Sequence, residues 1–293
     1  MGRRLSILLY YIFVIVGLAP GLSQAFEFKL IPRLNSGVFL YQFEQKAHLS
    51  GSISNSGFKL SSIMPFIQGG LTLYTGRAYL DFYAQKTFAG EDRETITITN
   101  VENPPSVSTT INGDIERQEY SVSAGVSITD NFTMFAGWRT STTSFDLKYG
   151  STLAGSMDRF EDKVDLDQRG FFIGGAGHLS IETQDRYIGL FTVNVAVGFL
   201  ESLFVFKSSK MITSEGQIID SQGSLLEPAG DVTSDTMGIN IAARWGGEIP
   251  KIDGFSYSLS ADGYIYTYSP DGESSFDYAE RAARFGVGLS YLF

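Results

Sequence analysis

The last ten residues of the chain read Arg284-Phe-Gly-Val-Gly-Leu-Ser-Tyr-Leu-Phe293 and alternate between large apolar side chains and mostly small or polar ones. Successive side chains of a β-strand point to opposite faces, so a strand here would carry one continuous apolar face. Five side chains would make up this face: Phe285, Val287, Leu289, Tyr291 and Phe293. The pattern therefore predicts a long strand with two different faces.

The same alternation recurs in earlier stretches, most clearly over residues 119–128, 237–245 and 255–262. Each of these is longer than the roughly 5–6 residues of a typical strand in a soluble protein. Beyond the N-terminal segment, no stretch has 18 consecutive apolar residues or keeps the apolar stripe of a helix. The sequence thus predicts an all-β chain with unusually long strands.

The first 25 residues, MGRRLSILLYYIFVIVGLAPGLSQA, follow a different pattern. Arg3 and Arg4 precede a continuous apolar stretch, and small residues precede Phe26. This order is typical of a secretory signal peptide, and we expect cleavage after Ala25. Because the segment carries two Arg and no acidic residue, its removal changes the formal net charge from −10 to −12. Residues 26–293 are predicted to form a single domain.

The composition excludes several classes of function. With 22 Lys and Arg against 32 Asp and Glu, and with no basic cluster, the chain would repel a phosphate backbone, so no nucleic-acid partner is expected. The absence of Cys excludes disulfide frameworks, thiolate metal sites and thiol catalysis. We expect neither a cofactor nor a dedicated metal site.

The C-terminal pattern, in a chain that begins with a signal peptide, resembles the terminal β-signal of Gram-negative outer-membrane β-barrel proteins. The resemblance covers residues 26–293 in architecture and the last ten residues in motif. It implies an antiparallel, up-and-down transmembrane β-barrel in the bacterial outer membrane, closed by its last strand. The partners that it implies are the barrel assembly machinery, outer-membrane lipids and lipopolysaccharide, while any surface partner stays open.

The number of alternating stretches predicts about ten strands, with eight or twelve as alternatives. We expect them at residues 27–42, 58–73, 77–88, 117–129, 132–145, 169–180, 187–203, 235–247, 254–268 and 280–293. Tight turns alternate with longer polar segments, which predicts short periplasmic turns and long extracellular loops. The longest loops are expected near 89–116, 146–168 and 204–234.

The polar faces of these strands carry charged residues. If the apolar faces point to lipid, eight titratable side chains would point inward: Arg77, Asp81, Glu119, Arg139, His178, Arg244, Asp262 and Arg284. A barrel of about eight strands is just filled by its side chains, so one of ten should be mostly filled. Buried charges must pair, which favours an ion-pair core over a thin pathway between the Arg side chains. Four aromatic residues are expected on the outward face: Trp138, Tyr187, Trp245 and Tyr257.

His178 and Ser180 would lie on the same face of one strand. The pair resembles the base and nucleophile of outer-membrane phospholipases and lipid A deacylases, in which an Asn or Glu on the next strand orients the His. A turn centred near residues 183–184 would place His178 opposite Gly189 and leave Asn194 roughly 16 Å away. The strand number and chain length also resemble the omptin proteases, whose sites use paired Asp and a His-Asp dipeptide. Both His of this chain are followed by Leu.

These patterns predict a non-enzymatic outer-membrane protein with a structural or surface-interaction role, carried by acidic extracellular loops. The acidic residues of two loops are Glu91, Asp92, Glu94, Glu102, Asp114 and Glu116 in one and Asp158, Glu161, Asp162, Asp165 and Asp167 in the other. One alternative is a narrow channel for small solutes or ions, lined by the inward Arg residues. Another is a lipid-modifying hydrolase that uses His178 and Ser180.

Overall fold

The computed structural model describes residues 28–47, 53–54, 57–100, 107–151, 158–183, 186–212, 218–220, 232–250, 252–270 and 276–292. Within these ranges, no helix is long and apolar enough to cross a membrane. The predicted signal peptide at 1–25 and the terminal Phe293 lie outside the described residues.

The described strands belong to one sheet. Their bounds are β1 (Phe28–Ala47), β2 (Ile53–Ser54), β3 (Gly57–Thr75), β4 (Ala78–Thr87), β5 (Gly90–Asn100), β6 (Val107–Thr129), β7 (Phe132–Ser151), β8 (Asp158–Thr183), β9 (Arg186–Ile212), β10 (Ile218–Asp220), β11 (Val232–Glu248), β12 (Phe255–Pro270) and β13 (Phe276–Tyr291).

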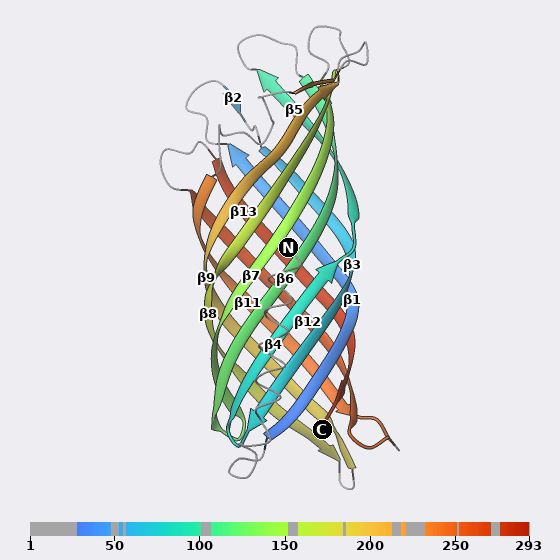
Figure 1. Ribbon diagram of the computed structural model, residues 1–293, viewed down its shortest axis with the longest axis vertical. Helices are drawn as coiled ribbons and strands as arrows, with labels where there is room; N and C mark the ends of the chain where they lie inside the picture. Colours follow the sequence, from blue (N-terminus) through green and yellow to red (C-terminus); the bar gives the residue numbers. More distant parts are fainter. Residues whose placement is uncertain are drawn as a thin grey trace.

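Ten strands close into an antiparallel barrel in the order β1, β3, β4, β6, β7, β8, β9, β11, β12 and β13 (Figure 1). The ring closes where β13 pairs with β1, from Ala47 opposite Phe276 to Arg33 opposite Ser290. β4 pairs with residues 118–126 of β6, and β5 pairs with residues 107–115 of the same strand. β4 and β5 therefore occupy one position in the barrel wall, one after the other along β6. The ten-stranded prediction is confirmed, and the alternatives of eight and twelve are wrong.

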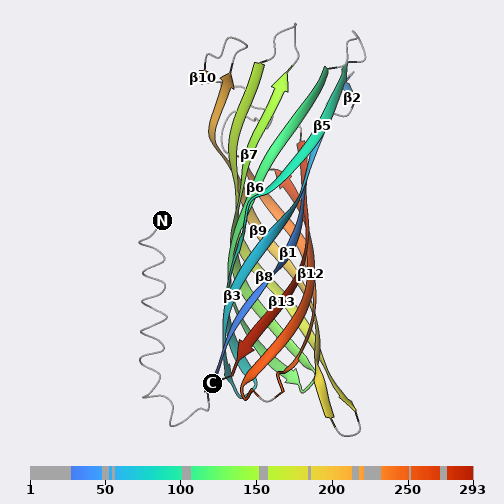
Figure 2. The ribbon, with the colours of Figure 1, turned by 90° about the vertical axis from the view of Figure 1, so that its right-hand side faces the viewer.

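The two ends of the barrel differ. Tight connections such as Gly76–Arg77 and Asp130–Asn131 gather at one end, which we call the short-turn end. At the opposite, tall end, β6 to β9 rise beyond β12 and β13 (Figure 2). The barrel therefore has a lopsided rim at its tall end.

Where the structure describes them, the predicted loops 89–116 and 146–168 consist largely of strand, and the predicted loop 204–234 begins with strand up to Ile212, so the bounds predicted for these loops were too wide. Residues 213–217 and 221–231 lie outside the described residues. β8 and β9 contain 26 and 27 residues, more than twice the roughly 9–11 that cross a bilayer. Near the tall end the outer faces of β7 and β8 are charged, as at Asp146 of β7 and Lys163 of β8, while the inward Val164 of β8 is buried. The alternation continues there, but a polar outward face makes the sequence look like loop.

An apolar band surrounds the short-turn half of the barrel. Its exposed side chains include Val38, Leu40, Ile63, Ile67, Val122, Val126, Met134, Trp138, Phe171, Ile173, Leu179, Val193, Val195, Phe199, Met237, Ile239, Ile241, Leu259, Ile265, Phe285, Val287 and Leu289. On β8 the band runs from Phe171 to Ile181, roughly 33 Å along the strand and about 25 Å in height at the usual tilt. That height matches the hydrocarbon core of an outer membrane.

The aromatic residues that were predicted to face outward do so wherever the structure describes their side chains. Trp138 is exposed on the outward face. Trp245 and Tyr257 lie outward near the short-turn end and pack edge to face, with ring centroids 5.6 Å apart. Tyr187 lies in β9, but its side chain is outside the description. Paired aromatics at this height are typical of a membrane–water interface.

A buried apolar and aromatic cluster fills the barrel toward the tall end. Its members include Phe39, Tyr41, Phe43, Leu60, Met64, Ile111, Ile115, Phe145, Leu147, Val164, Leu166, Leu200, Phe204, Tyr268 and Tyr278. Inward glycines make room for such rings. A Cβ on Gly238 would lie 2.2 Å from the ring of Tyr266, so that ring can lie flat across the neighbouring strand only because residue 238 is Gly.

Replacing Ile241 with Arg is expected to destabilise the barrel by about 2–4 kcal/mol, because the charge would lie in the middle of the apolar band. Thr233→Arg is the matched control on the same strand and outward face, beyond the band, where the cost should fall to about 0–1 kcal/mol. Urea titrations of both variants in lipid vesicles measure the difference. Equal costs would contradict the position of the band.

Candidate functional site: the charged interior

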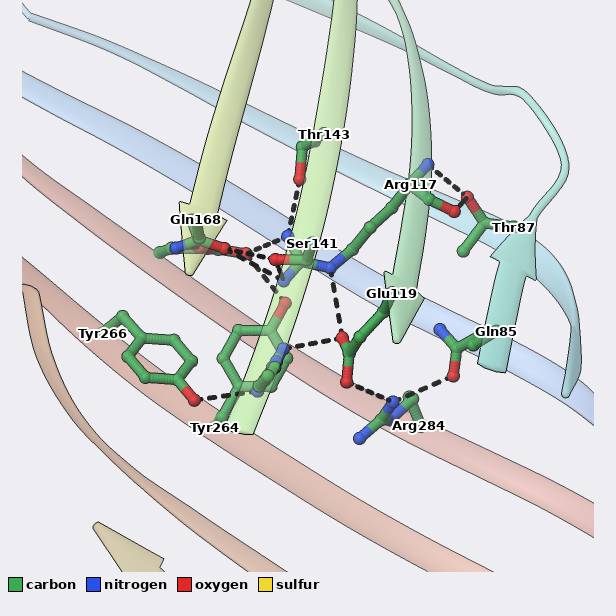
Figure 3. Close-up of polar contacts among 12 residues, drawn as sticks. Gln85, Thr87, Arg117, Glu119, Ser141, Thr143, Gln168, Tyr264, Tyr266 and Arg284 are labelled. Carbon is green, nitrogen blue, oxygen red and sulfur yellow. Dashed lines mark hydrogen bonds and ion pairs between the residues drawn. The ribbon is translucent and has the colours of Figure 1, made fainter. Parts of the chain in front are cut away.

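Arg117 of β6 lies at the centre of a polar layer beneath the aromatic cluster (Figure 3). Its Nη1 donates to Glu280 Oε1 at 2.7 Å, and its Nη2 donates to Ser141 Oγ at 2.9 Å and Gln168 Oε1 at 3.1 Å. The side chains of Arg117 and Glu280 are both 0% exposed. This ion pair is therefore dry, and it joins strands that lie 163 residues apart in sequence.

Glu280 of β13 accepts hydrogen bonds on both carboxylate oxygens. Oε1 also receives the hydroxyl of Tyr264 at 2.8 Å, while Oε2 receives Gln168 Nε2 at 2.9 Å and the hydroxyl of Tyr268. A buried carboxylate is tolerated when its lone pairs are occupied in this way. Glu280 is consequently held by residues of β6, β8 and β12.

Glu119 and Arg139 form the second part of the layer. Arg139 Nη2 donates to Glu119 Oε2 at 2.6 Å, and its Nη1 donates to the hydroxyl of Tyr266 at 2.8 Å. The guanidinium also lies 4.9 Å from the ring centroid of Tyr264, a cation–π arrangement. Arg117 Nε lies 3.5 Å from the same Glu119 oxygen, which links the two parts.

Arg284 of β13 forms the lower edge of the layer. Its Nε donates to Asp262 Oδ1 at 2.6 Å, and its Nη1 donates to Gln85 Oε1 at 2.9 Å and to the hydroxyl of Tyr83. Glu119 Oε1 lies 3.6 Å from the same Nη1. Three Arg thus meet three carboxylates: Arg117, Arg139 and Arg284 with Glu119, Asp262 and Glu280. The layer is electrically balanced.

The interior side chains toward the short-turn end are partly exposed. The side chains of Asp81 and Arg33, which form an ion pair there, are 21% and 18% exposed, and Asp262 is 19% exposed. Above them Arg117 and Glu280 are fully buried. We call this partly exposed part of the interior, between the short-turn end and the charged layer, the vestibule.

His178 lies in this vestibule between two hydroxyl groups. Its Nε2 is 3.1 Å from Thr133 Oγ1, and its Nδ1 is 3.2 Å from Thr192 Oγ1. The predicted register was wrong: His178 lies opposite Thr192 rather than Gly189, and Asn194 lies opposite Ala176. The shift of three residues arises because β8 ends later than expected, at Thr183, and the register jumps by one residue near Ile181.

Most of the sequence-predicted charged residues come together, but not all of them belong to the layer. Glu119, Arg139, Asp262 and Arg284 are joined by ion pairs, while Asp81, Arg244 and His178 lie in the vestibule. Arg77 is wrongly placed by the sequence argument. Thr75 pairs directly with Ala78, so Arg77 is a turn residue with an exposed side chain.

Four interior residues were not predicted from the sequence: Arg33, Arg117, Gln168 and Glu280. A usable signal was present, because residues of the same parity on one strand share a face. Arg117 shares parity with Glu119, and Glu280 shares parity with Arg284. Both stand at the first residue of a predicted strand, where we assigned no inward position.

The closed ring of ten antiparallel strands, the apolar band outside it and the filled interior define a class: this is the fold of a bacterial outer-membrane β-barrel. No family model and no curated protein matches the sequence. The outer-membrane protease OmpT from Escherichia coli has a similar structure, with a TM-score of 0.52 and 11% identity over 92% of this chain and 100% of that chain.

Two further solved barrels match less well. The translocator domain of the autotransporter NalP from Neisseria meningitidis gives a TM-score of 0.35 at 11% identity, over 97% of this chain and 96% of that chain. A FadL homologue from Pseudomonas aeruginosa gives 0.33 at 11% identity, over 90% of each chain.

The prediction that the protein is not an enzyme is contradicted by the match to OmpT. That barrel is a protease, so this architecture is compatible with catalysis. The missing His-Asp dipeptide, on which part of the prediction rested, excludes only one arrangement of catalytic groups. At 11% identity the likeness shows the fold and assigns no activity to this chain.

Proposed function

We propose that this protein is an outer-membrane barrel with a sealed interior that acts at the cell surface, through its tall strand extensions and the segments that connect them. The observation that carries the proposal is the dry layer around Arg117 and Glu280, closed above by aromatic rings. A solute would have to break this layer to pass. A role at the cell surface would use the tall end of the barrel, and it does not require an open interior.

The tall end has the chemistry of a hydrated surface. Lys163 Nζ lies 2.8 Å from Asp146 Oδ2, and this hydrogen bond raises the pKa of Lys163. Lys207 pairs with Asp165 at the same end, and Arg169 pairs with Glu201 at 3.0 Å just beyond the apolar band. Such a surface, at the height of lipid headgroups, suits contact with lipopolysaccharide and its divalent cations as well as with a partner.

Export and assembly complete the proposal. Residues 1–25 would be removed as a signal peptide, and the last strand would be the signal read by the barrel assembly machinery. The position of β13 supports this role, because its pairing with β1 closes the ring and three of its proposed signal residues, Phe285, Val287 and Leu289, face outward. The short-turn end would then be periplasmic.

The alternative is a narrow channel, and conductance separates the two. We expect the refolded protein in planar bilayers to show no single-channel steps, because the fully buried pair of Arg117 and Glu280 lies between the vestibule and the tall end. A porin refolded in the same way is the positive control. Reproducible steps that change ion selectivity in Asp262→Asn would overturn the sealed-barrel proposal in favour of a channel.

Orientation can be tested independently, since the chain contains no Cys. A membrane-impermeant maleimide applied to intact cells should label Lys163→Cys, at the tall end, and spare Asp253→Cys, in an exposed turn at the other end. Both should react after lysis. The reverse labelling would place the tall end in the periplasm and end the surface role.

A further inference from the structure

The vestibule contains a cation that the balanced layer does not neutralise. Arg33 forms an ion pair with Asp81, whose Oδ1 also accepts the Thr72 hydroxyl at 2.6 Å. Arg244 of β11 has no carboxylate within ion-pair distance among the described residues. Its guanidinium donates a single hydrogen bond within that set, from Nη2 to Ser258 Oγ at 3.1 Å.

The electrostatic surroundings of Arg244 make this arrangement costly. The side chain is half-buried. Of the charges near it, that of Arg33 repels it, and that of Asp81, which attracts it, already forms an ion pair with Arg33. A guanidinium offers five donors in a planar fork, and most of those of Arg244 have no protein acceptor here. Arg33 Nε, in contrast, is buried without a hydrogen-bond partner among the described residues. Two cations and one carboxylate thus lie in the same partly exposed part of the interior, and the carboxylate pairs with Arg33 alone among the described residues.

We propose that Arg244, supported by Arg33, forms a binding site for a small oxyanion that enters the vestibule from the short-turn end. The ligand class is inorganic phosphate or the carboxylate of a small organic acid, since both present paired oxygens to a guanidinium fork. One negative charge balances the two Arg against Asp81. Hydroxyl groups close to the site, such as that of Ser258, donate to the remaining ligand oxygens.

Calorimetric titration of the refolded barrel tests the site. In 150 mM sodium chloride, phosphate or acetate is expected to bind with one-to-one stoichiometry, and the tighter of the two identifies the ligand class. Arg244→Gln should weaken that binding about tenfold or more, because it removes a charged hydrogen bond. Arg77→Gln is the matched control, since it removes the same charge from an exposed turn at the same end and should bind like the wild type.

Unfolding supplies a second measurement that does not depend on heats of binding. Adding the bound anion should raise the urea midpoint of the wild type and of Arg77→Gln, and leave that of Arg244→Gln unchanged. Without the anion, Arg244→Gln should be at least as stable as the wild type, because it removes an uncompensated charge. This result also shows that the variant folds.

Three outcomes would overturn the site. The wild type could bind neither anion saturably, it could lose binding when sodium chloride is present, or Arg244→Gln could bind as tightly as the wild type. The second outcome would reduce the effect to general screening of the vestibule charges. None of these outcomes bears on the sealed layer, which the conductance measurement tests separately.

Discussion

Replacing Glu280 with Ala is expected to lower the free energy of unfolding by about 3–5 kcal/mol, the usual cost of breaking a buried ion pair. The substitution leaves Arg117, which is 0% exposed, with Glu119 as its only carboxylate among the described residues, at the longer distance of 3.5 Å. It also removes the acceptor of the Tyr264 and Tyr268 hydroxyls. Equilibrium unfolding in lipid vesicles measures the loss.

Asp262→Ala is the matched control for this prediction. It also removes a carboxylate from an Arg, but Asp262 is 19% exposed and Arg284 keeps contacts to Glu119 and Gln85. Water can solvate what remains, so the loss should be clearly smaller than for Glu280→Ala. Equal losses would show that the two positions are equally hydrated and that the layer does not seal the barrel.

Replacing Phe293 with Asp is expected to remove most of the protein from the outer membrane. The residue would end the apolar face that begins at Phe285, and a charge there disrupts the signal through which the last strand is recognised and inserted. Since β13 closes the ring against β1 over 15 residue pairs, a chain that fails at this step cannot complete the barrel. It should be diverted to periplasmic degradation, and surface labelling with quantitative blotting of outer-membrane fractions measures the outcome.

Leu292→Asp tests whether the effect belongs to the aromatic face. It places the same charge one residue earlier and leaves Phe293 in place, so the surface level should fall much less. Normal levels of Phe293→Asp would refute the assembly role. Equal losses in both variants would show that any charge at the C-terminus is harmful and that the assembly machinery does not recognise the alternating aromatic face.

The sequence predicted the fold well because lipid imposes a strict pattern. At Val122, Ile239 and Phe285 the apolar face must point outward, and alternation reveals it without any knowledge of the partner strand. The strand ends were less predictable. Beyond the band both faces of a strand contact either water or other side chains, so the tall extensions of β8 and β9 have no lipid-facing signal.

The interior was only partly predictable for a different reason. Parity places Glu119 and Arg284 inside, but it does not say which strands face each other across the barrel. The pair of Arg117 with Glu280 depends on closure and on the stagger of all ten strands. Small errors in a predicted strand register also add up. At His178 the turn comes later than predicted and the register shifts by one residue near Ile181, so the residue opposite is Thr192 and not Gly189.

The layer around Arg117 has a consequence for the time course of assembly. Its hydrogen bonds to Ser141, Gln168 and Glu280 span 24, 51 and 163 residues, so no single hairpin can complete it. Until the last strand arrives, Arg117 and Glu280 must remain hydrated, and an unfinished sheet has to keep its lumen wet. Contacts of such long range make folding slow and cooperative. Loss of water from the interior is thus the event that distinguishes a finished barrel from an open one.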